Sequence, residues 1–579
     1  MPSTVAVLGP FSGGLNKTSD ASAIANNELS ELVNLDVDYD GSLVCRPPMC
    51  EIPYNTLVAG EGGVGGGIAP PVYVDPSPGG GIGGGIGGVD GGSFYSGGPR
   101  NLVIGTANIN SISYLLVSNN LGIWAFKKSN DSTDEFEIMD RFLIHGTLRS
   151  DCAIQLHNVI YILATPNSPS KGGTWDGTTF TPDATDVRGS SALFFKGRVW
   201  VTPGVYQTQH PKSSQLVLSD PVPLTLPITV PWNPVNIIPV GQGDGENLVD
   251  MLVVADNLML FKNNSTYAYL YDVAPNDGIL RKVNNNIGAS AQFCVLTHEN
   301  EAYVYHEGSV YQISNYTFVE ASIKMIFEPP SVLDDRREKV ALSLLGNTLL
   351  VRYFDRMYAL NLKTKTWSEW QSDSSNLNSV GRILKLEYSE VSTKLEGYYG
   401  GSVLSNNINL VRIRPGHTAL DREYDTSILE SGFGRNTFDI SCSMTTKIFD
   451  FTAPHVYKRL MWWGVDVISS GNLIGIANPV TQTGPVTWDN LTTYTWDQLY
   501  AWNNLLSQVA YVETDIEDPF VIRRKFMKLL KSLRFRQIAF TIKLKSDGRI
   551  AEEDTLGPAR IFTLSAIVGI KQTVVKPVS

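Results

Sequence analysis

Short runs in which apolar and polar residues alternate, separated by turn residues, make up most of the chain. From about residue 100 to 415 these runs form strand–turn–strand units that recur at intervals of roughly 40 residues. The units begin at Ser113, Cys152, Ala192, Met251, Gln292 and Val340. This interval is typical of β-propeller blades, whereas the strands of a sandwich recur about every 8 to 12 residues. The pattern predicts an all-β fold with a β-propeller of about six or seven blades over 100–415. One or two β-sandwiches are the alternative.

After residue 425 the alternation continues but the interval is lost. Four segments alternate cleanly: Phe438 to Phe451, Arg459 to Ile468, Ser532 to Lys545, and Ala559 to Ile570. Because two packed sheets satisfy such alternation, we expect a C-terminal β-sandwich over 425–579.

The first hundred residues divide into two segments. Residues 1–58 predict an N-terminal arm with a short helix over Ser22–Val33 and a strand that runs into the Asp40-Gly41 turn. Residues 59–99 form a glycine-rich insertion, since 18 of the 52 glycines lie between Gly60 and Gly98. A tract of this composition builds no core. We expect it to be ordered by contact with other subunits and to be sensitive to proteases in an isolated chain.

Composition excludes several classes of protein. The 579 residues are 42% hydrophobic and 10% aromatic, which is too apolar for a disordered chain. A net charge of −11 argues against nucleic-acid binding by bulk electrostatics. Five cysteines without a CxxC pair argue against a disulfide scaffold or a zinc site, and we interpret them as reduced, packed thiols. We expect no export signal and no membrane span, because no charged leader and no apolar run of about 18 residues occur.

One segment has the spacing of a cation-binding loop. Asp36, Asp38 and Asp40 alternate before Gly41, as at the start of an EF-hand loop. The twelfth position is Pro47 instead of a bidentate glutamate, so a plain strand and turn is the favoured interpretation. We expect no metal and no cofactor, and these three residues are only weak metal candidates.

A tryptophan repeat lies near the C-terminus. The sequence W-[DN]-x-L occurs three times, at Trp488, Trp496 and Trp502. Indole rings beside Asp and Asn side chains are typical of carbohydrate-binding surfaces, but large aromatic residues are more often packed. Packing is therefore favoured, and carbohydrate binding is the alternative.

A basic segment between Pro519 and Ser546 has no acidic residue. Its nine cations are Arg523, Arg524, Lys525, Lys528, Lys531, Arg534, Arg536, Lys543 and Lys545. The remainder of the chain carries −11 minus 9, or −20. Because such an acidic surface is available on a second copy, we expect the first seven of these residues to contact a neighbouring subunit in preference to nucleic acid.

No catalytic arrangement is evident in the sequence. It lacks GxxxxGK[ST], HExxH and GxSxG, and its seven histidines are scattered. We therefore expect a protein that is not an enzyme.

Two stretches resemble a known family. The first is Gly13-Gly14-Leu15-Asn16 followed by Asn34 to Asp38, Gly41, Leu43, Arg46, Pro47 and Pro48. The second is Asp256 to Tyr267, Asn286-Ile287-Gly288-Ala289, and Tyr303 to Ile313. Both are similar to segments of tailed-bacteriophage tail proteins of the nozzle, hub and minor-tail type. Arg536 to Val568 and the tryptophan repeat also resemble segments of minor tail proteins.

The resemblance implies a structural virion protein assembled in the host cytoplasm. It would form a homo-oligomeric ring with a β-propeller body that connects tail parts and forms the channel for DNA ejection. Its partners would be an adaptor protein and fibres or spikes, and DNA would pass through without specific binding. Two alternatives stay open: a peripheral minor tail protein that binds host-surface carbohydrate, and an enzyme that degrades cell-wall polysaccharide.

Overall fold

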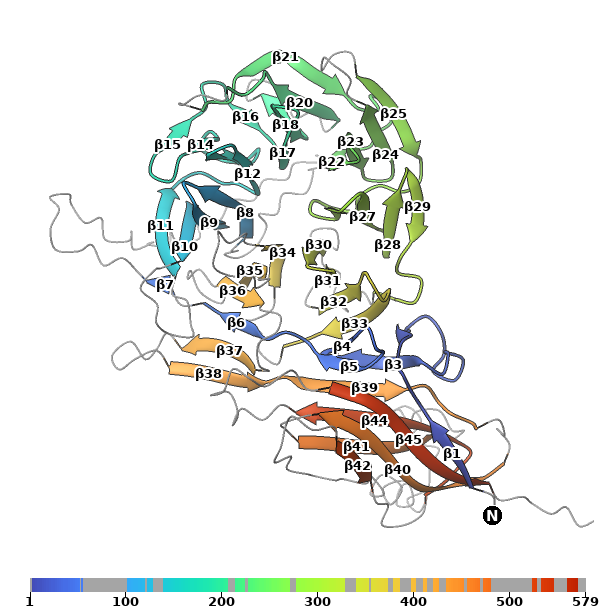
Figure 1. Cartoon of the computed structure of the whole chain (residues 1–579). Coiled ribbons are helices and arrows are strands. Elements are labelled where there is room, and N and C mark those ends of the chain that lie inside the picture. The colour runs from blue at the N-terminus through green and yellow to red at the C-terminus, as the bar shows by residue number, and fades with distance from the viewer. Residues whose placement is uncertain are drawn as a thin grey trace, which may run out of the picture. The chain divides into compact units, whose positions relative to one another are not determined.

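The computed structural model is all-β wherever it describes the chain (Figure 1). The described residues are 3–52, 54–55, 102–119, 122–128, 139–206, 214–223, 228–270, 278–327, 340–353, 356–372, 379–385, 397–401, 410–413, 420–425, 434–451, 456–468, 472–480, 523–527, 533–545 and 560–570. Among them, no helix is long and apolar enough to cross a bilayer. The chain divides into two compact units, one of Met1–Glu51, Asn101–Val103 and Asp250–Ser579, the other of Ile52–Arg100 and Ile104–Val249.

The second unit contains three antiparallel meanders. The strands of the first are β8 (Leu102–Ile109), β9 (Ile112–Asn119), β10 (Gly122–Lys128) and β11 (Met139–His145), with β7 (Tyr54–Asn55) added at its edge. Those of the second are β12 (Cys152–Leu156), β13 (Val159–Leu163), β14 (Gly173–Trp175) and β15 (Phe180–Pro182). Those of the third are β17 (Ser191–Phe195), β18 (Arg198–Thr202), β20 (Gln215–Ser219) and β21 (Trp232–Pro239). The second unit also contains a separate two-stranded antiparallel sheet, formed by β16 (Val187–Arg188) and β19 (Val205–Tyr206).

The first unit contains four more sheets of this kind. Three of them are complete local meanders. The strands of the first are β22 (Leu248–Val254), β23 (Asn257–Lys262), β24 (Thr266–Leu270) and β25 (Ile279–Asn284), and those of the second are β26 (Val295–His298), β27 (Glu301–His306), β28 (Ser309–Ser314) and β29 (Thr317–Glu320). Those of the third are β30 (Val340–Leu345), β31 (Thr348–Tyr353), β32 (Arg356–Asn361) and β33 (Thr366–Trp370). The strand–turn–strand units expected from the sequence are confirmed. Seven such sheets are the blades of a β-propeller, within the expected range.

The fourth strand of the last blade comes from the other end of the chain. Strands β34 (Ser379–Lys385), β35 (Gly397–Gly401) and β36 (Leu410–Ile413) form a meander, and β6 (Met49–Glu51) pairs with β36. Val411 lies opposite Glu51 in this antiparallel register. Strands β37 (Leu420–Asp425) and β38 (Gly434–Asp439) extend the same sheet beyond β6. The N-terminal segment therefore completes a blade and is not a separate arm.

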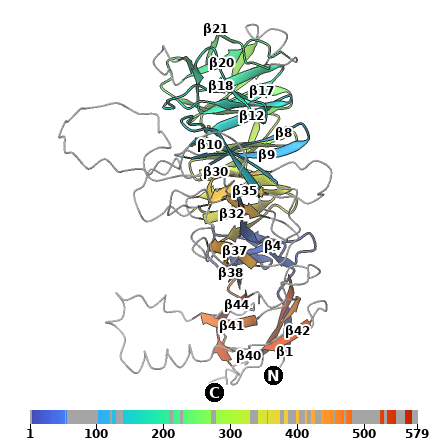
Figure 2. The ribbon, with the colours of Figure 1, turned by 90° about the vertical axis from the view of Figure 1, so that its left-hand side faces the viewer.

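The C-terminal strands form a sandwich that also incorporates N-terminal strands (Figure 2). One layer contains β3 (Glu28–Val33), β39 (Ser441–Thr446), β44 (Gln537–Lys545) and β41 (Asn472–Val480), with the short β2 (Gly14–Leu15) beside β3. The other contains β4 (Leu35–Val37), β5 (Leu43–Cys45), β45 (Arg560–Ile570), β40 (Lys458–Ile468) and β42 (Arg523–Met527), with β1 (Ser3–Val7) on β45 and β43 (Leu533–Phe535) on β40. Between the layers, the rings of Trp463 and Phe540 lie 5.1 Å apart.

The helix expected over Ser22–Val33 is wrong, because the second half of this segment is strand β3. Leu29 and Leu32 are fully buried in it, with β39 paired on one side and the end of β33 on the other. The Asp20 carboxylate accepts a hydrogen bond from the Ser22 amide at 2.8 Å, which closes a turn instead of capping a helix. Backbone pairing to two neighbouring strands outweighs the near-helical spacing of the apolar residues.

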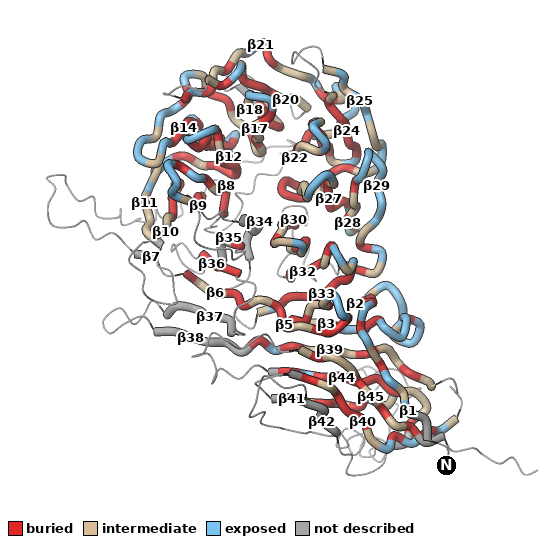
Figure 3. Tube along the Cα trace, in the orientation of Figure 1, coloured by how far each residue is buried: buried red, intermediate tan, exposed pale blue. Residues whose placement is uncertain are grey.

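Blade strands are buried on both faces where one blade packs against the next, whereas outer strands such as β25 and β29 are exposed (Figure 3). Strand β27 has an aromatic face with Tyr303 and Tyr305 and an aliphatic face with Ala302 and Val304, and both are covered. Phe327 packs between two blades, 5.8 Å from Tyr305 in β27 and 5.7 Å from Tyr353 in β31. Aromatic packing of this kind adds to the area that each blade buries.

Trp463 provides a test of the sandwich core. Its side chain is fully buried, so Trp463→Ala leaves a large cavity and we expect a loss of about 3–5 kcal/mol in the free energy of unfolding. Met461→Ala on the same strand is the control, because Met461 is 53% exposed and should change stability by less than about 0.5 kcal/mol. Urea unfolding measures both variants. Equal effects would contradict the assignment of Trp463 to the core between the layers.

Candidate functional site

Asn34 lies where the N-terminal strands, a propeller blade and the sandwich meet. This residue has a φ of 58° and links β3 to β4. Its backbone amide donates to the Glu369 carbonyl at 2.7 Å, and its side-chain amide donates to the Ser441 carbonyl at 2.9 Å. Its side-chain oxygen accepts from the Gln371 amide at 2.7 Å. One asparagine thus joins the end of β33 to the start of β39, and Asn is among the few residues that tolerate this backbone conformation.

Arg46, which directly follows strand β5, completes this junction. The side chain is only 1% exposed. Its Nε donates to Asn34 Oδ1 at 2.8 Å, and its two terminal nitrogens donate to the carbonyls of Pro47 at 2.8 Å and Gln371 at 2.7 Å. Burying a cation is costly unless its donors are satisfied, and the planar guanidinium satisfies acceptors in three directions. We call Asn34, Arg46 and their partners the N-terminal junction.

Asp36 anchors the next strand to the same blade. Its carboxylate accepts hydrogen bonds from the Ser368 hydroxyl and from Trp370 Nε1, the latter at 2.7 Å. Burial raises the pKa of the Asp36 carboxyl, while the two hydrogen bonds and the charge of Arg46 act to lower it. The carboxyl group is therefore a structural acceptor inside the junction.

Two ion pairs hold the loop before β3 and the first residue of β3 against the blades. Lys17 Nζ lies 2.8 Å from Glu369 Oε2, and Lys324 Nζ lies 2.8 Å from Glu28 Oε1. Glu28 and Glu369 are mostly buried, so these pairs are screened less than surface pairs. They add charged contacts at the outer margin of the N-terminal junction.

The second stretch that carries the family resemblance also has a structural use. Asn286 to Ala289 pack on the turn between β23 and β24, where Ala289 N donates to the Lys262 carbonyl at 2.8 Å and Thr266 Oγ1 donates to the Ile287 carbonyl at 2.7 Å. A Cβ atom on Gly288 would lie 2.0 Å from the Lys262 carbonyl oxygen. Only glycine allows the two turns to approach this closely.

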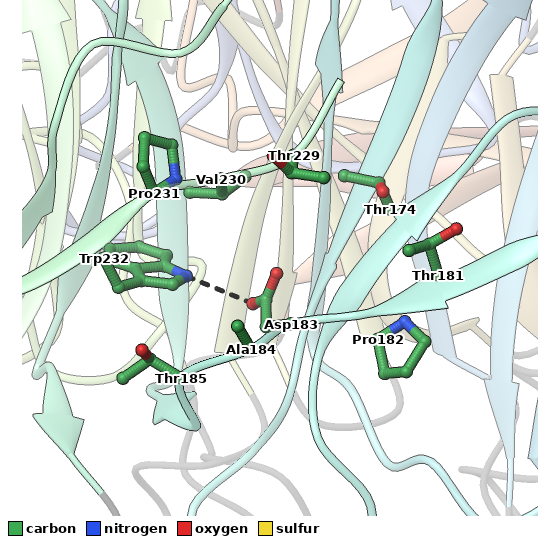
Figure 4. Close-up of a pocket in the computed structure, with 10 residues that line it drawn as sticks. All are labelled: Thr174, Thr181, Pro182, Asp183, Ala184, Thr185, Thr229, Val230, Pro231 and Trp232. Atoms are coloured by element: carbon green, nitrogen blue, oxygen red, sulfur yellow. Dashed lines mark hydrogen bonds between the residues drawn. The ribbon is translucent and has the colours of Figure 1, made fainter. Parts of the chain in front are cut away.

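A pocket of about 310 Å³ lies within the second unit, beside β14, β15 and β21 (Figure 4). Its lining residues are Thr174, Thr181, Pro182, Asp183, Ala184, Thr185, Thr229, Val230, Pro231 and Trp232. Asp183 is the ionisable group among them. Its Oδ2 accepts from the Tyr161 hydroxyl at 2.8 Å and from Trp232 Nε1 at 3.1 Å. Figure 4 shows the other carboxylate oxygen pointing away from the indole, toward the side where Thr229 lies.

Burial raises the pKa of the Asp183 carboxyl to about 6, and the nearby charge of Asp186 raises it further, although hydrogen bonds from Tyr161 and Trp232 act in the opposite direction. The carboxyl group also satisfies the polar atoms of two buried aromatic side chains. A single carboxylate in this lining does not provide the acid and base pair that glycosidases use. The geometry fits a structural acceptor that leaves one oxygen available to a hydrogen-bond donor.

The structure does not bring the carboxylates of Asp36, Asp38 and Asp40 to one point. Asp36 binds within the junction, Asp38 pairs with Arg560 at 2.9 Å, and Asp40 accepts from the Ser42 amide at 2.9 Å. Among the described residues, no group of three or more His, Cys, Asp or Glu side chains could hold a metal ion. The strand and turn at this segment are β4, β5 and the loop between them.

The other predicted site residues lie partly outside the description. Trp488, Trp496, Trp502, Lys528 and Lys531 are not among the described residues, and neither is the glycine-rich segment 59–99. Strand β42 includes Arg523, Arg524 and Lys525, and β43 includes Arg534; their backbones pair with β40. The Arg536 guanidinium lies 4.6 Å from the centre of the Tyr457 ring in the same chain. The predicted subunit contact of this basic segment stays a prediction.

Comparisons with known proteins give limited guidance. No family model and no curated protein matches the chain. The chain is similar to the extracellular domain of a proposed hybrid two-component system from B. thetaiotaomicron (14% identity, 67% of this chain and 46% of that chain, TM-score 0.33), so the match spans under half of that protein's length. It is also similar to an exo-β-1,3-galactanase from Phanerochaete chrysosporium (11%, 80% and 95%, TM-score 0.25) and to the Pan2 WD40 domain from Neurospora crassa (11%, 56% and 90%, TM-score 0.34).

Arg46 tests the N-terminal junction. Arg46→Ala leaves buried acceptors without a donor, and we expect it to lower the free energy of unfolding by about 3 kcal/mol or more. Arg46→Lys should lose less, because the charge stays while the planar fork is lost. Arg560→Ala is the control, since its pair with Asp38 is about one-third exposed and should contribute about 1 kcal/mol or less. Denaturant unfolding decides, and similar losses for Arg46→Ala and Arg560→Ala would contradict the buried network.

Asp183 tests the electrostatics of the pocket. Because its pKa is higher in the folded state than the ordinary 3.8, the folded protein binds this proton more tightly, and the resulting stability is present below pH 4 and lost as the pH rises through about 6. The stability of the wild type relative to Asp183→Asn should therefore fall by on the order of 3 kcal/mol between pH 4 and pH 7. Unfolding curves of both proteins at each pH measure this difference. A difference that is constant with pH would contradict it.

Proposed function

We propose that the protein is a structural, non-enzymatic component of a phage tail, a nozzle- or hub-like ring subunit that connects tail parts. The observation that carries the proposal is where the residues of the family resemblance lie. Asn34, Asp36 and Arg46 are buried in the N-terminal junction and bind a blade and the sandwich. Because these residues, which carry the resemblance to phage tail proteins, hold the fold together, they favour a structural role for the protein.

The second similar stretch supports the same interpretation. Gly288 and Lys262 allow two turns of a blade to approach closely, and no exposed chemical group is built from them. Strand β6, which precedes the first blade in the chain, closes the last blade by pairing with β36, so backbone hydrogen bonds join the two ends of the propeller segment. The net charge of −11 favours a channel wall that repels DNA instead of binding it.

The two alternatives are carbohydrate binding and degradation of cell-wall polysaccharide, and the described residues test them to different extents. Carbohydrate binding at Trp488, Trp496 and Trp502 falls on residues outside the description. The pocket at Asp183 contributes hydroxyl groups, one available carboxylate oxygen and an indole, but Trp232 is only 8% exposed and offers little surface for stacking a sugar. Degradation of cell-wall polysaccharide has no pair of carboxylates to support it in this pocket. The structural role is therefore the proposal.

Imaging of intact particles tests this function. We expect several copies of the chain around the tail axis in phage particles that incorporate it, located by electron cryomicroscopy and by gold-labelled antibody. Particles assembled with the Arg46→Ala chain should lack this density, whereas those with Arg560→Ala should keep it, because only the first change disrupts the junction.

Two outcomes would contradict the proposal. A chain that stays monomeric and absent from particles would exclude a tail component. Labelling only at fibre tips, with binding to host glycans that Trp488→Ala abolishes, would favour the carbohydrate-binding alternative.

A further inference from the structure

Two cysteines that are far apart in the sequence lie together in the first unit. Cys45 ends β5, Cys442 lies in β39, and 397 positions separate them. Their Sγ atoms are 3.3 Å apart. A disulfide bond is about 2.05 Å long, so the two sulfurs need to approach by little more than about 1 Å to form one. The side chains are 6% and 3% exposed, so the site is internal to the fold.

We propose that Cys45 and Cys442 form a modification site, at which a peroxide oxidises the two thiols to an intramolecular disulfide that ties the β4–β5 hairpin to β39. The inference does not depend on the proposed function. Other buried thiols have different neighbours: Cys152 Sγ lies 3.4 Å from the Ala192 carbonyl and Cys294 Sγ lies 3.5 Å from the Val340 carbonyl.

The chemistry balances in two steps. The Cys45 sulfur attacks one peroxide oxygen, the O–O bond breaks, and a sulfenic acid and one water are formed. The Cys442 sulfur then attacks the sulfenic sulfur, the S–S bond forms, and a second water leaves with the thiol proton. Two thiols are oxidised and one peroxide is reduced to two waters. Cys45 is the first sulfur to react in this scheme and Cys442 is the resolving one, because the Cys442 thiol is held by its hydrogen bond to the Asn34 carbonyl.

The surroundings tolerate the bond. Cys442 Sγ now donates to the Asn34 carbonyl at 3.2 Å, and oxidation removes this weak donor. The same carbonyl keeps the hydrogen bond from the Arg46 amide at 3.0 Å. The disulfide would therefore add a covalent link beside the N-terminal junction without leaving a buried acceptor unpaired. The thiols should stay reduced inside a reducing cell and oxidise after release from it.

Peptide mapping of the full chain provides the test. The folded protein is treated with hydrogen peroxide, free thiols are alkylated, and digested peptides are identified by mass spectrometry without reduction. We expect a Cys45–Cys442 cross-linked peptide and a rise of a few degrees in melting temperature, both reversed by dithiothreitol. Cys45→Ser and Cys442→Ser should each abolish the peptide and the rise, and Cys152→Ser should keep both.

Other products would overturn the proposal. Cys50 is partly exposed and serves as an internal check that the peroxide has acted. If Cys50 is oxidised while Cys45 and Cys442 are both recovered in alkylated form, the pair does not react. Sulfinic or sulfonic acid at Cys45 would show that Cys442 does not resolve the sulfenic acid. The mapping uses wild-type protein, so it remains decisive even if a serine variant fails to fold.

Discussion

The buried hydrogen-bond network between Arg46 and Asn34 is the interaction on which the first unit depends. It lies where a propeller blade, the N-terminal strands and the sandwich meet, and its side-chain hydrogen bonds reinforce the sheet in which β3 pairs with both β33 and β39. A buried guanidinium requires every neighbouring acceptor to be in place. The junction therefore holds these three parts in one arrangement, and disrupting it removes support from all of them.

The path of the N-terminal segment explains why such a junction is needed. Within about fifty residues the chain contributes strands to the sandwich, to the sheet that continues from blade strand β33, and to the last blade. A segment that changes sheets so often has few local hydrogen bonds in each. Ion pairs such as Lys17 with Glu369, and the anchoring of Asp36 by Trp370, provide the side-chain contacts that local pairing does not. The same geometry places Cys45 against Cys442, which allows a covalent link at this point.

The two buried carboxylates Asp36 and Asp183 have the same structural use. Asp183 satisfies Tyr161 and Trp232, as Asp36 satisfies Ser368 and Trp370. Each carboxylate is buried beside aromatic residues whose polar atoms need a partner. In both cases burial raises the pKa of the carboxyl, and each carboxylate accepts its hydrogen bonds from buried side chains that need an acceptor. Perturbed carboxyl groups here indicate packing of polar aromatic side chains and are not evidence of catalysis.

The sequence by itself determined the local elements. Alternation with a period of two and turns at regular intervals predicted the blade hairpins, the C-terminal strands and the Asp-Gly turn, because strand pairing across a short loop depends on neighbouring residues. The prediction of a helix over Ser22–Val33 was wrong, because the pairing of β3 with the distant strands β33 and β39 outweighed the near-helical spacing of its apolar residues. The strand β6 in the last blade, the partners of Arg46 and Asp183, and the contact between Cys45 and Cys442 join residues tens to hundreds of positions apart. Such contacts leave no periodic signal in one sequence, so only the tertiary structure decided them.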